Sequence, residues 1–257
     1  MPAALRVWRE RDGRLLRVRL SRPKANVLDA EMVSALDEAF AAAPAAGVPA
    51  LLGVLLDAEG PHFSFGASVE EHLPGKCAAM LRGFHALLLR MLELPVPVLV
   101  AVRGQCLGGG LELASAGGLL FASPDAKLGQ PEIVLGVFAP AASCLLPERI
   151  GPAAAEELLL SGRSVDAQEA LRLGLVSAVA DDPEAAALAF FDGHLAKKSA
   201  TSLGWALRAA RAGMVERVRT KLSALEDLYL SGLMSTRDAS EGLAAFLEKR
   251  PPRWEDR

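Results

Sequence analysis

Hydrophobic and polar residues alternate over the first twenty positions of the chain. Two β-prone runs, residues 5–8 and 15–20, flank an Asp-Gly pair at residues 12–13, and this pattern predicts a β-hairpin. The arginines of the hairpin alternate along it, so they are expected to form a solvated face. Apolar residues then recur at helical spacing after Asp29, which is expected to cap a helix over residues 30–43.

Two later apolar runs have the character of strands that are buried on both faces. They cover residues 51–56 and 98–102, and a helical pattern over residues 77–94 lies between them. Pro95 and Pro97 are expected to end that helix. This strand–helix–strand alternation predicts a mainly parallel sheet with crossover helices.

After about residue 150 the predicted elements are mainly helices. Short helical patterns are separated by Gly and Pro, and residues 201–249 are almost continuously helical, with Ser235-Thr236 as an N-cap for the last helix. The tail over residues 251–257 is expected to be irregular. There is no internal repeat and no low-complexity linker, so the helical end is expected to pack on the core or on a neighbouring subunit.

Composition narrows the class of protein. The 257 residues are 51% hydrophobic and 23% charged, which permits a sizeable core, and the net charge of −3 argues against nucleic acid or an anionic membrane as the main partner. No apolar run is long enough to span a membrane, and the first residues contain no signal-like segment. Three cysteines without a CxxC pair indicate a reducing compartment. A cytoplasmic protein is expected.

The run of three glycines at residues 108–110 is the most informative part of the sequence. It follows a buried strand and leads directly into a helix with Glu112 in its first turn. Glycine is unfavourable in a helix, so the run indicates a backbone that approaches something closely, with helix amides directed at negative charge. A tight turn that needs only one glycine is the alternative. Neither a dinucleotide fingerprint nor a phosphate-binding P-loop is present.

Two glutamates are candidates for acid–base chemistry. Glu112 lies in an otherwise apolar helix, and Glu132 lies in a turn bounded by Gly129 and Pro131. Two carboxyl groups near a glycine-rich anion pocket suit proton transfer on a carbonyl compound, because mutual repulsion separates their pKa values. An exposed helix glutamate is the alternative for Glu112, and spacing alone does not bring the two together.

Other candidate sites are weaker. The loop over residues 63–68 contains Gly66, whose freedom would let a nearby amide act as a second oxyanion donor, although a plain connecting loop is the alternative. The four histidines lack paired metal-ligand spacing, so no metal site is expected. There is no GxSxG motif for a serine hydrolase, and Cys106 fits a small core residue better than a nucleophile.

Six short runs together resemble the crotonase (enoyl-CoA hydratase/isomerase) superfamily over essentially the whole chain. They are residues 22–26, 65–67, 107–114, 129–133, 135–136 and 246–250. The resemblance implies an α/β fold with a crotonase-like ββα spiral core over residues 1–198. It also implies a helical trimerisation region over residues 199–257, and a homotrimer or a hexamer made of two trimers.

The resemblance also implies roles for particular residues. The amides of Ala67 and Gly109 would form an oxyanion hole for a CoA thioester, with Glu112 and Glu132 as the acid–base pair. Lys24 and Ala25 would lie beside the nucleotide part of CoA. The remaining residues expected around the substrate are Gly66, Ser68, Gly108, Pro131, Leu135 and Phe138. No separate cofactor is implied, because CoA is part of the substrate.

Because both glutamates are present, the resemblance implies addition of water to a conjugated acyl-CoA thioester. This chain departs from the family pattern at Ser68, where Asp is frequent, and over residues 137–144, where Phe138 and Pro140 replace a glycine-rich acyl-pocket segment. The acyl group is therefore expected to be a flat ring, with 1,4-addition of water across a cyclic diene. The alternatives are a general enoyl-CoA hydratase of β-oxidation, an RNA-binding relative and a structural trimer with a vestigial site.

Overall fold

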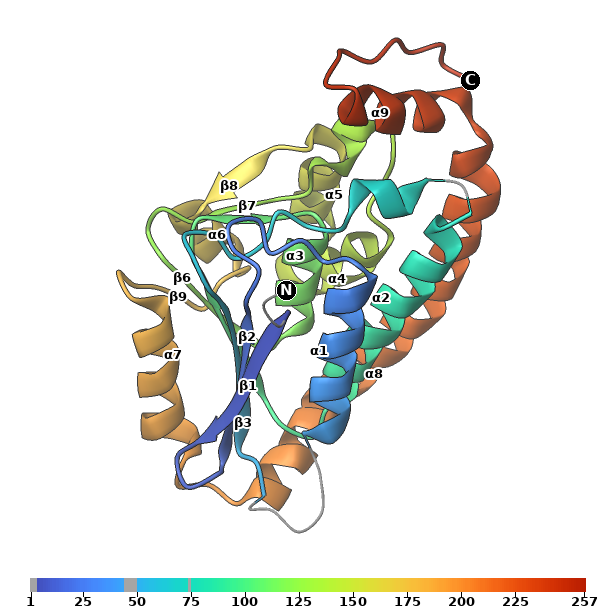
Figure 1. Ribbon diagram of the computed structural model, residues 1–257. Helices are drawn as coiled ribbons and strands as arrows, with labels where there is room; N and C mark the ends of the chain where they lie inside the picture. The colour runs from blue at the N-terminus through green and yellow to red at the C-terminus, as the bar shows by residue number, and fades with distance from the viewer. Residues whose placement is uncertain (1–3, 44–49, 74) are drawn as a thin grey trace.

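The computed structural model describes residues 4–43, 50–73 and 75–257. Its centre is a six-stranded sheet in the order β1-β2-β3-β4-β6-β9 (Figure 1). The bounds are Leu5–Glu10 for β1, Leu15–Leu20 for β2, Gly53–Ala58 for β3, Val98–Val102 for β4, Leu119–Ala122 for β6 and Ala178–Val179 for β9. Only the β1–β2 pair is antiparallel among these neighbours, so the predicted hairpin and the mainly parallel sheet are confirmed.

Helices cover both faces of this sheet (Figure 1). On one face lie α1 (Ala30–Ala42), which Asp29 caps through the amide of Met32 at 2.9 Å, and α2 (Cys77–Glu93). On the other face lies α7 (Pro183–Phe190), which continues into a π-helical turn over Phe191–Leu195. Successive side chains of the central strands point to opposite faces of the sheet, and each face belongs to a different apolar cluster. The strands are therefore buried on both sides, as expected.

A second, three-stranded sheet carries the glycine run. It consists of β5 (Gln105–Leu107), β7 (Lys127–Gly129) and β8 (Ser164–Asp166), in that order. The expectation of one buried strand running into the glycines is wrong. Strand β4 ends before Arg103 and Gly104, and a separate strand, β5, leads into the glycines. Gly104 has φ +51°, a conformation that L side chains rarely adopt.

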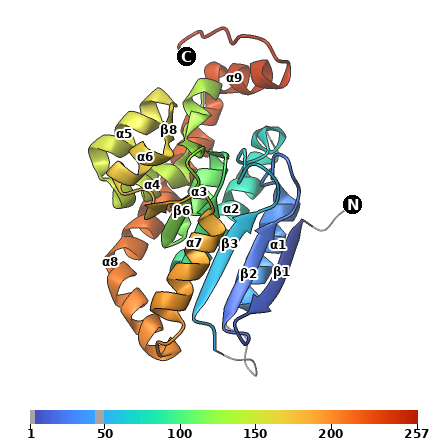
Figure 2. The same ribbon diagram turned by 90° about the vertical axis from the view of Figure 1, so that its left-hand side faces the viewer.

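Helices form most of the chain after β7. A 3₁₀ turn over Pro131–Leu135 leads to α4 (Pro140–Ile150), α5 (Pro152–Ser161) and α6 (Ala167–Leu173), which lie beyond the sheet edge opposite the hairpin (Figure 2). The long α8 (Ala200–Asp227) packs against α2 and α4. No helix in the described residues is long and apolar enough to cross a membrane.

The last helix is folded back over the 3₁₀ turn. Thr236 caps α9 (Arg237–Leu247) as predicted, and the irregular tail returns across it, with Asp238 accepting from the amides of Glu255 and Asp256. Trp254 lies so close to Gly136 and Gly242 that a Cβ at either glycine would stand 3.0 Å from its ring. The tail thus fastens α9 to the segment that follows Glu132.

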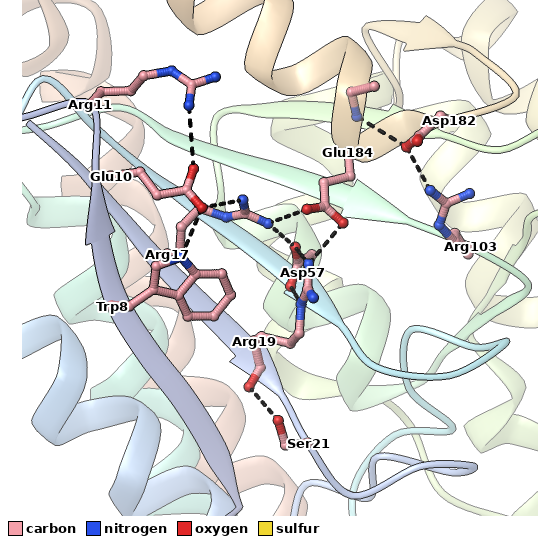
Figure 3. Close-up of polar contacts among 11 residues, drawn as sticks. Trp8, Glu10, Arg11, Arg17, Arg19, Ser21, Asp57, Arg103, Asp182 and Glu184 are labelled. Atoms are coloured by element: carbon pink, nitrogen blue, oxygen red, sulfur yellow. Dashed lines mark hydrogen bonds and ion pairs between the residues drawn. The ribbon is translucent and has the colours of Figure 1, made fainter.

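The expected solvated arginine face of the hairpin is wrong for Arg17. Its side chain is buried, and Nη2 lies 2.5 Å from both Asp57 and Glu184, while Arg19 bonds the same two carboxylates at 2.7–2.8 Å (Figure 3). Trp8 lies beneath both guanidinium groups. The reason is that Glu184 of α7, 167 residues from Arg17 along the chain, lies against this face of the hairpin, so Arg17 and Arg19 are paired rather than solvated.

Removing Asp57 should destabilise the fold. Asp57→Ala leaves the buried Arg17 and the partly buried Arg19 with one fewer carboxylate, and breaking such a buried pair by deleting one partner costs about 3 kcal/mol. Urea unfolding measures this change. Glu157→Ala removes a carboxylate from the exposed pair with Arg163 and should leave the urea midpoint unchanged. Equal midpoints for Asp57→Ala and the parent protein would contradict the structural role.

Candidate active site

The glycine run lies against two other parts of the chain, the loop over residues 63–68 and the turn that holds Glu132. A Cβ on Gly108 would stand 2.6 Å from a carboxylate oxygen of Glu132. A Cβ on Gly109 would stand 3.1 Å from the amide nitrogen of Ala67, and one on Gly110 would stand 2.8 Å from Ser64. Gly108 also has φ +53°. The alternative of a tight turn that needs a single glycine is therefore wrong, since a side chain is excluded or tightly restricted at all three positions.

The loop around Gly66 is more than a plain connection. Gly66 has φ +97°, its carbonyl accepts from Leu28, and its amide donates to the hydroxyl of the buried Ser64 at 3.0 Å. These bonds place Ala67 directly against Gly109. Within the described residues no hydrogen bond uses the amide of Ala67. The amide of Gly109, in the first turn of α3 (Gly109–Ala116), has no partner within the helix.

Helix α3 is buried along its whole length, and its ends are held by other elements. At its carboxyl end the Arg149 guanidinium donates to the carbonyls of Ser115 and Gly118 at 3.0 Å, which satisfies acceptors that a helix end leaves unpaired. The amino end of the helix, with Gly109 and Glu112, is therefore held in a fixed position at the cavity.

A cavity of about 360 Å³ opens in front of the glycine turn. Both glutamates lie on its wall, so the structure brings together the pair that sequence spacing left unresolved. Its lining includes these predicted site residues: Gly66, Ala67, Gly108, Gly109, Glu112, Pro131, Glu132, Leu135 and Phe138. Most of the remaining lining is apolar. The ring of Phe138 makes an edge-on contact with that of Tyr229, with 5.2 Å between the two ring centroids.

Glu112 is buried in the cavity wall, so the exposed-glutamate alternative is wrong. Its carboxylate accepts from the amide of Ala142 at 2.6 Å, at the start of α4. Burial raises the pKa of Glu112 to about 7, although hydrogen bonds from the amides of Ala142 and Ala141 oppose the shift. A carboxyl group that titrates near neutrality can both give and take a proton under ordinary conditions.

Glu132 faces Glu112 from the 3₁₀ turn. Burial in the cavity, and then the nearby charge of Glu112, raise the pKa of Glu132 to about 8. The amide of the buried Gln130 lies 2.9 and 3.1 Å from the two carboxylate oxygens, in the orientation that lets its NH₂ donate to both. Sequence reasoning missed Gln130, although it lies two residues before Glu132 in the same motif.

Three predicted residues lie outside the lining of this cavity. Lys24 is exposed, Ala25 accepts at its carbonyl from the amide of Phe65, and Ser68 accepts at its carbonyl from His72. The lining instead includes two histidines, His72 and His85, that sequence reasoning had set aside. Among the described residues, no group of three or more His, Cys, Asp or Glu is placed to hold a metal ion.

The family model for enoyl-CoA hydratase/isomerase matches residues 10–257. The chain belongs to this family. Cyclohexa-1,5-dienecarbonyl-CoA hydratase of Thauera aromatica is 63% identical to it over 98% of this chain and 97% of that protein. A probable enoyl-CoA hydratase of Bacillus subtilis is 36% identical over 90% and 92%, and carnitinyl-CoA dehydratase of Proteus mirabilis is 32% identical over 95% and 96%.

Solved structures support the same fold for the chain. A putative enoyl-CoA hydratase from Mycobacterium avium paratuberculosis K-10 superposes with a TM-score of 0.87 at 27% identity, covering 98% of this chain and 99% of that one. An enoyl-CoA hydratase from Mycobacterium avium gives 0.86 at 27% identity, covering 99% and 100%. The expected crotonase-like core with a helical carboxyl-terminal region is therefore confirmed.

The coupling between the two glutamates can be measured directly. In Glu112→Gln the neighbouring charge is gone, so the pKa of Glu132 should fall from its raised value while burial still keeps it above an ordinary glutamate. Carboxyl ¹³C NMR of labelled glutamate follows the titration. Glu216→Gln, on the exposed face of α8, serves as the control. A Glu132 pKa that is identical in both variants would show that the carboxyl groups do not interact.

Proposed function

We propose that this protein is a hydratase that adds water to a conjugated acyl-CoA thioester. The observation that carries the proposal is the convergence of Glu112 and Glu132 on one cavity with the amides of Ala67 and Gly109, for which the described residues provide no hydrogen-bond acceptor. Membership of the enoyl-CoA hydratase/isomerase family supports it. An RNA-binding or vestigial scaffold would have no use for two carboxyl groups with raised pKa values in a cavity.

The amides of Ala67 and Gly109 act as the oxyanion hole. As water attacks the carbon β to the thioester, negative charge moves onto the thioester oxygen, and two fixed N–H donors stabilise it. Losing one such donor typically costs about 2.7–4 kcal/mol of activation free energy. Gly109 is required because a Cβ there would crowd the Ala67 amide.

The two glutamates divide the proton transfers. One takes a proton from the attacking water in its ionised form, and the other delivers a proton to carbon from its protonated form. The repulsion between them favours a state in which the pair holds a single proton. Gln130 donates to the carboxylate of Glu132 and holds it toward the cavity.

The substrate is cyclohexa-1,5-diene-1-carbonyl-CoA, as in the named activity of the Thauera aromatica relative. Water adds at the carbon β to the thioester, and the dienolate is protonated at its far end, which gives 6-hydroxycyclohex-1-ene-1-carbonyl-CoA. Support comes from the wall around Phe138, Ala139 and Pro140, which is stiff and apolar because Pro140 opens α4 and Phe138 packs on Tyr229. A general enoyl-CoA hydratase is the second candidate, favoured by the 36% identical relative from Bacillus subtilis.

The helical region over residues 199–257 makes a homotrimer, or a hexamer of two trimers. The exposed apolar side chains of Leu228, Phe246 and Trp254 in this region support an interface. Lys24 and Ala25 lie beside the nucleotide part of CoA, and no cofactor besides the substrate is needed. The enzyme works in the cytoplasm, which the three free, buried cysteines support.

Replacing either glutamate should abolish most of the activity. Glu112→Gln and Glu132→Gln keep the shape of the side chain but lose the transferable proton, which is worth about 10²- to 10⁴-fold in turnover. Steady-state hydration assays give kcat, and calorimetric titration with a saturated acyl-CoA should show nearly unchanged binding. Near-normal turnover in either variant would remove that residue from the mechanism.

The acyl specificity is tested with two thioesters. The cyclic dienoyl-CoA should be hydrated with at least about tenfold higher kcat/KM than crotonyl-CoA, because each poorly fitting methylene costs about 1–3 kcal/mol in a shaped pocket. Phe138→Ala should narrow this ratio by loosening the wall. If crotonyl-CoA is the better substrate, the general hydratase is the correct function and the ring-specific proposal fails.

A further inference from the structure

His85 is a buried histidine on the wall of the acyl cavity. It lies on α2, is 3% exposed, and lines the cavity beside Leu81 and Phe84. Glu112 lines the same cavity from α3, which packs against α2. The two-glutamate mechanism does not use His85, so its place on the cavity needs an account of its own.

A carboxylate on another helix fixes the imidazole of His85. Glu226, on α8, has a carboxylate oxygen 2.5 Å from Nδ1 of His85. Burial lowers the pKa of His85 and the charge of Glu226 opposes the shift, so the ring is neutral near pH 7. A neutral ring that donates from Nδ1 to a carboxylate presents a lone pair at Nε2, and this tautomer follows from the hydrogen-bond pattern.

The Nε2 atom has no hydrogen-bond partner within the described part of the chain. A donor that reaches this free acceptor can come from the cavity that His85 lines. The other titratable groups on the cavity wall are Glu112, Glu132 and His72. Of these groups, Glu112 accepts from a backbone amide and His72 is bonded to the carbonyl of Ser68.

We propose that Nε2 of His85 accepts a hydrogen bond from the water that adds to the acyl group, and then from the hydroxyl of the product. The proposal rests on the proposed hydratase function. The attacking water has two O–H bonds. One breaks as a glutamate takes the proton, the C–O bond forms, and the π electrons move to the thioester oxygen. The second O–H bond stays intact as the product hydroxyl, and it needs an acceptor in a cavity that is otherwise mostly apolar.

Glu226 is a positioning residue in this arrangement. Because it holds Nδ1–H, the ring cannot turn its proton toward the water, and Nε2 remains an acceptor throughout the reaction. A water held at two points, by a glutamate and by His85, has its oxygen lone pair directed at the carbon β to the thioester. This is a gain in orientation that appears in kcat rather than in thioester binding.

Variants of His85 separate this role from packing. His85→Leu should lower kcat about 10- to 100-fold while KM changes less than about threefold, because only the water loses a partner. His85→Gln keeps an acceptor oxygen and should restore most of the turnover. The controls are His194→Gln, an exposed histidine, and Glu216→Gln, an exposed glutamate of α8. Circular dichroism checks that each variant is folded.

Two outcomes would overturn the proposal. Turnover of His85→Leu within threefold of the parent enzyme would show that the water does not use Nε2. Equal losses in folded His85→Leu and His85→Gln would assign the effect to packing. The wild-type assay separates the failure of the ring-specific function from the failure of the His85 proposal. If only crotonyl-CoA is hydrated, the ring-specific function fails. The same variants are then compared on crotonyl-CoA, whose hydration needs the same water.

A matched pair of ligands tests the wild-type protein even if His85→Leu does not fold. In ¹⁵N-histidine-labelled enzyme, the Nε2 resonance of His85 is assigned by its loss in His85→Gln. It should move when 6-hydroxycyclohex-1-ene-1-carbonyl-CoA is added, and much less with cyclohex-1-ene-1-carbonyl-CoA, which lacks the hydroxyl. An Nε2 resonance that responds equally to both ligands would contradict a hydrogen bond to the hydroxyl.

Discussion

The absence of side chains at three successive positions controls the geometry of this site. Gly108, Gly109 and Gly110 let the start of α3 lie against Glu132, Ala67 and Ser64. A single methyl group would push one of these partners away. The sheet, the helices and the Arg149 contacts at the other end of α3 serve to hold that bare backbone in place. The amides of Ala67 and Gly109 are therefore held in positions as fixed as the fold itself.

Electrostatics adds a second constraint, because two carboxyl groups share the wall of one cavity. Burial raises the pKa values of Glu112 and Glu132, and each carboxyl group makes the ionisation of the other harder. The backbone amides of Ala141 and Ala142 oppose the shift of Glu112 without removing it. The pair is therefore sensitive to anything that enters the cavity, since a ligand changes the solvation of both groups at once.

Local patterns in the sequence predicted much of the fold and of the site. The hairpin, the Asp29 and Thr236 caps and the parallel sheet follow from spacing and turn chemistry, and the glycine run and its glutamates were identifiable by type. What failed depends on contacts between distant segments. The burial of Arg17 comes from α7, and the significance of His85 comes from Glu226, 141 residues away. Local spacing contains no such information. Gln130, in contrast, lies two residues before Glu132 and could have been identified from the sequence.

The fastening of the tail through Trp254 has a consequence for how the protein is made. The ribosome synthesises the chain from its amino end. The sheet, the glycine turn and both glutamates therefore emerge before α9 has been made. The segment after Glu132 then gains its cover only when residues 237–257 arrive, because Gly136 and Gly242 are where Trp254 rests. A nascent chain can thus have its sheet in place while the segment after Glu132 is still uncovered. A chain that lacks residues 237–257 would lose the part of the cavity lining that α9 contributes.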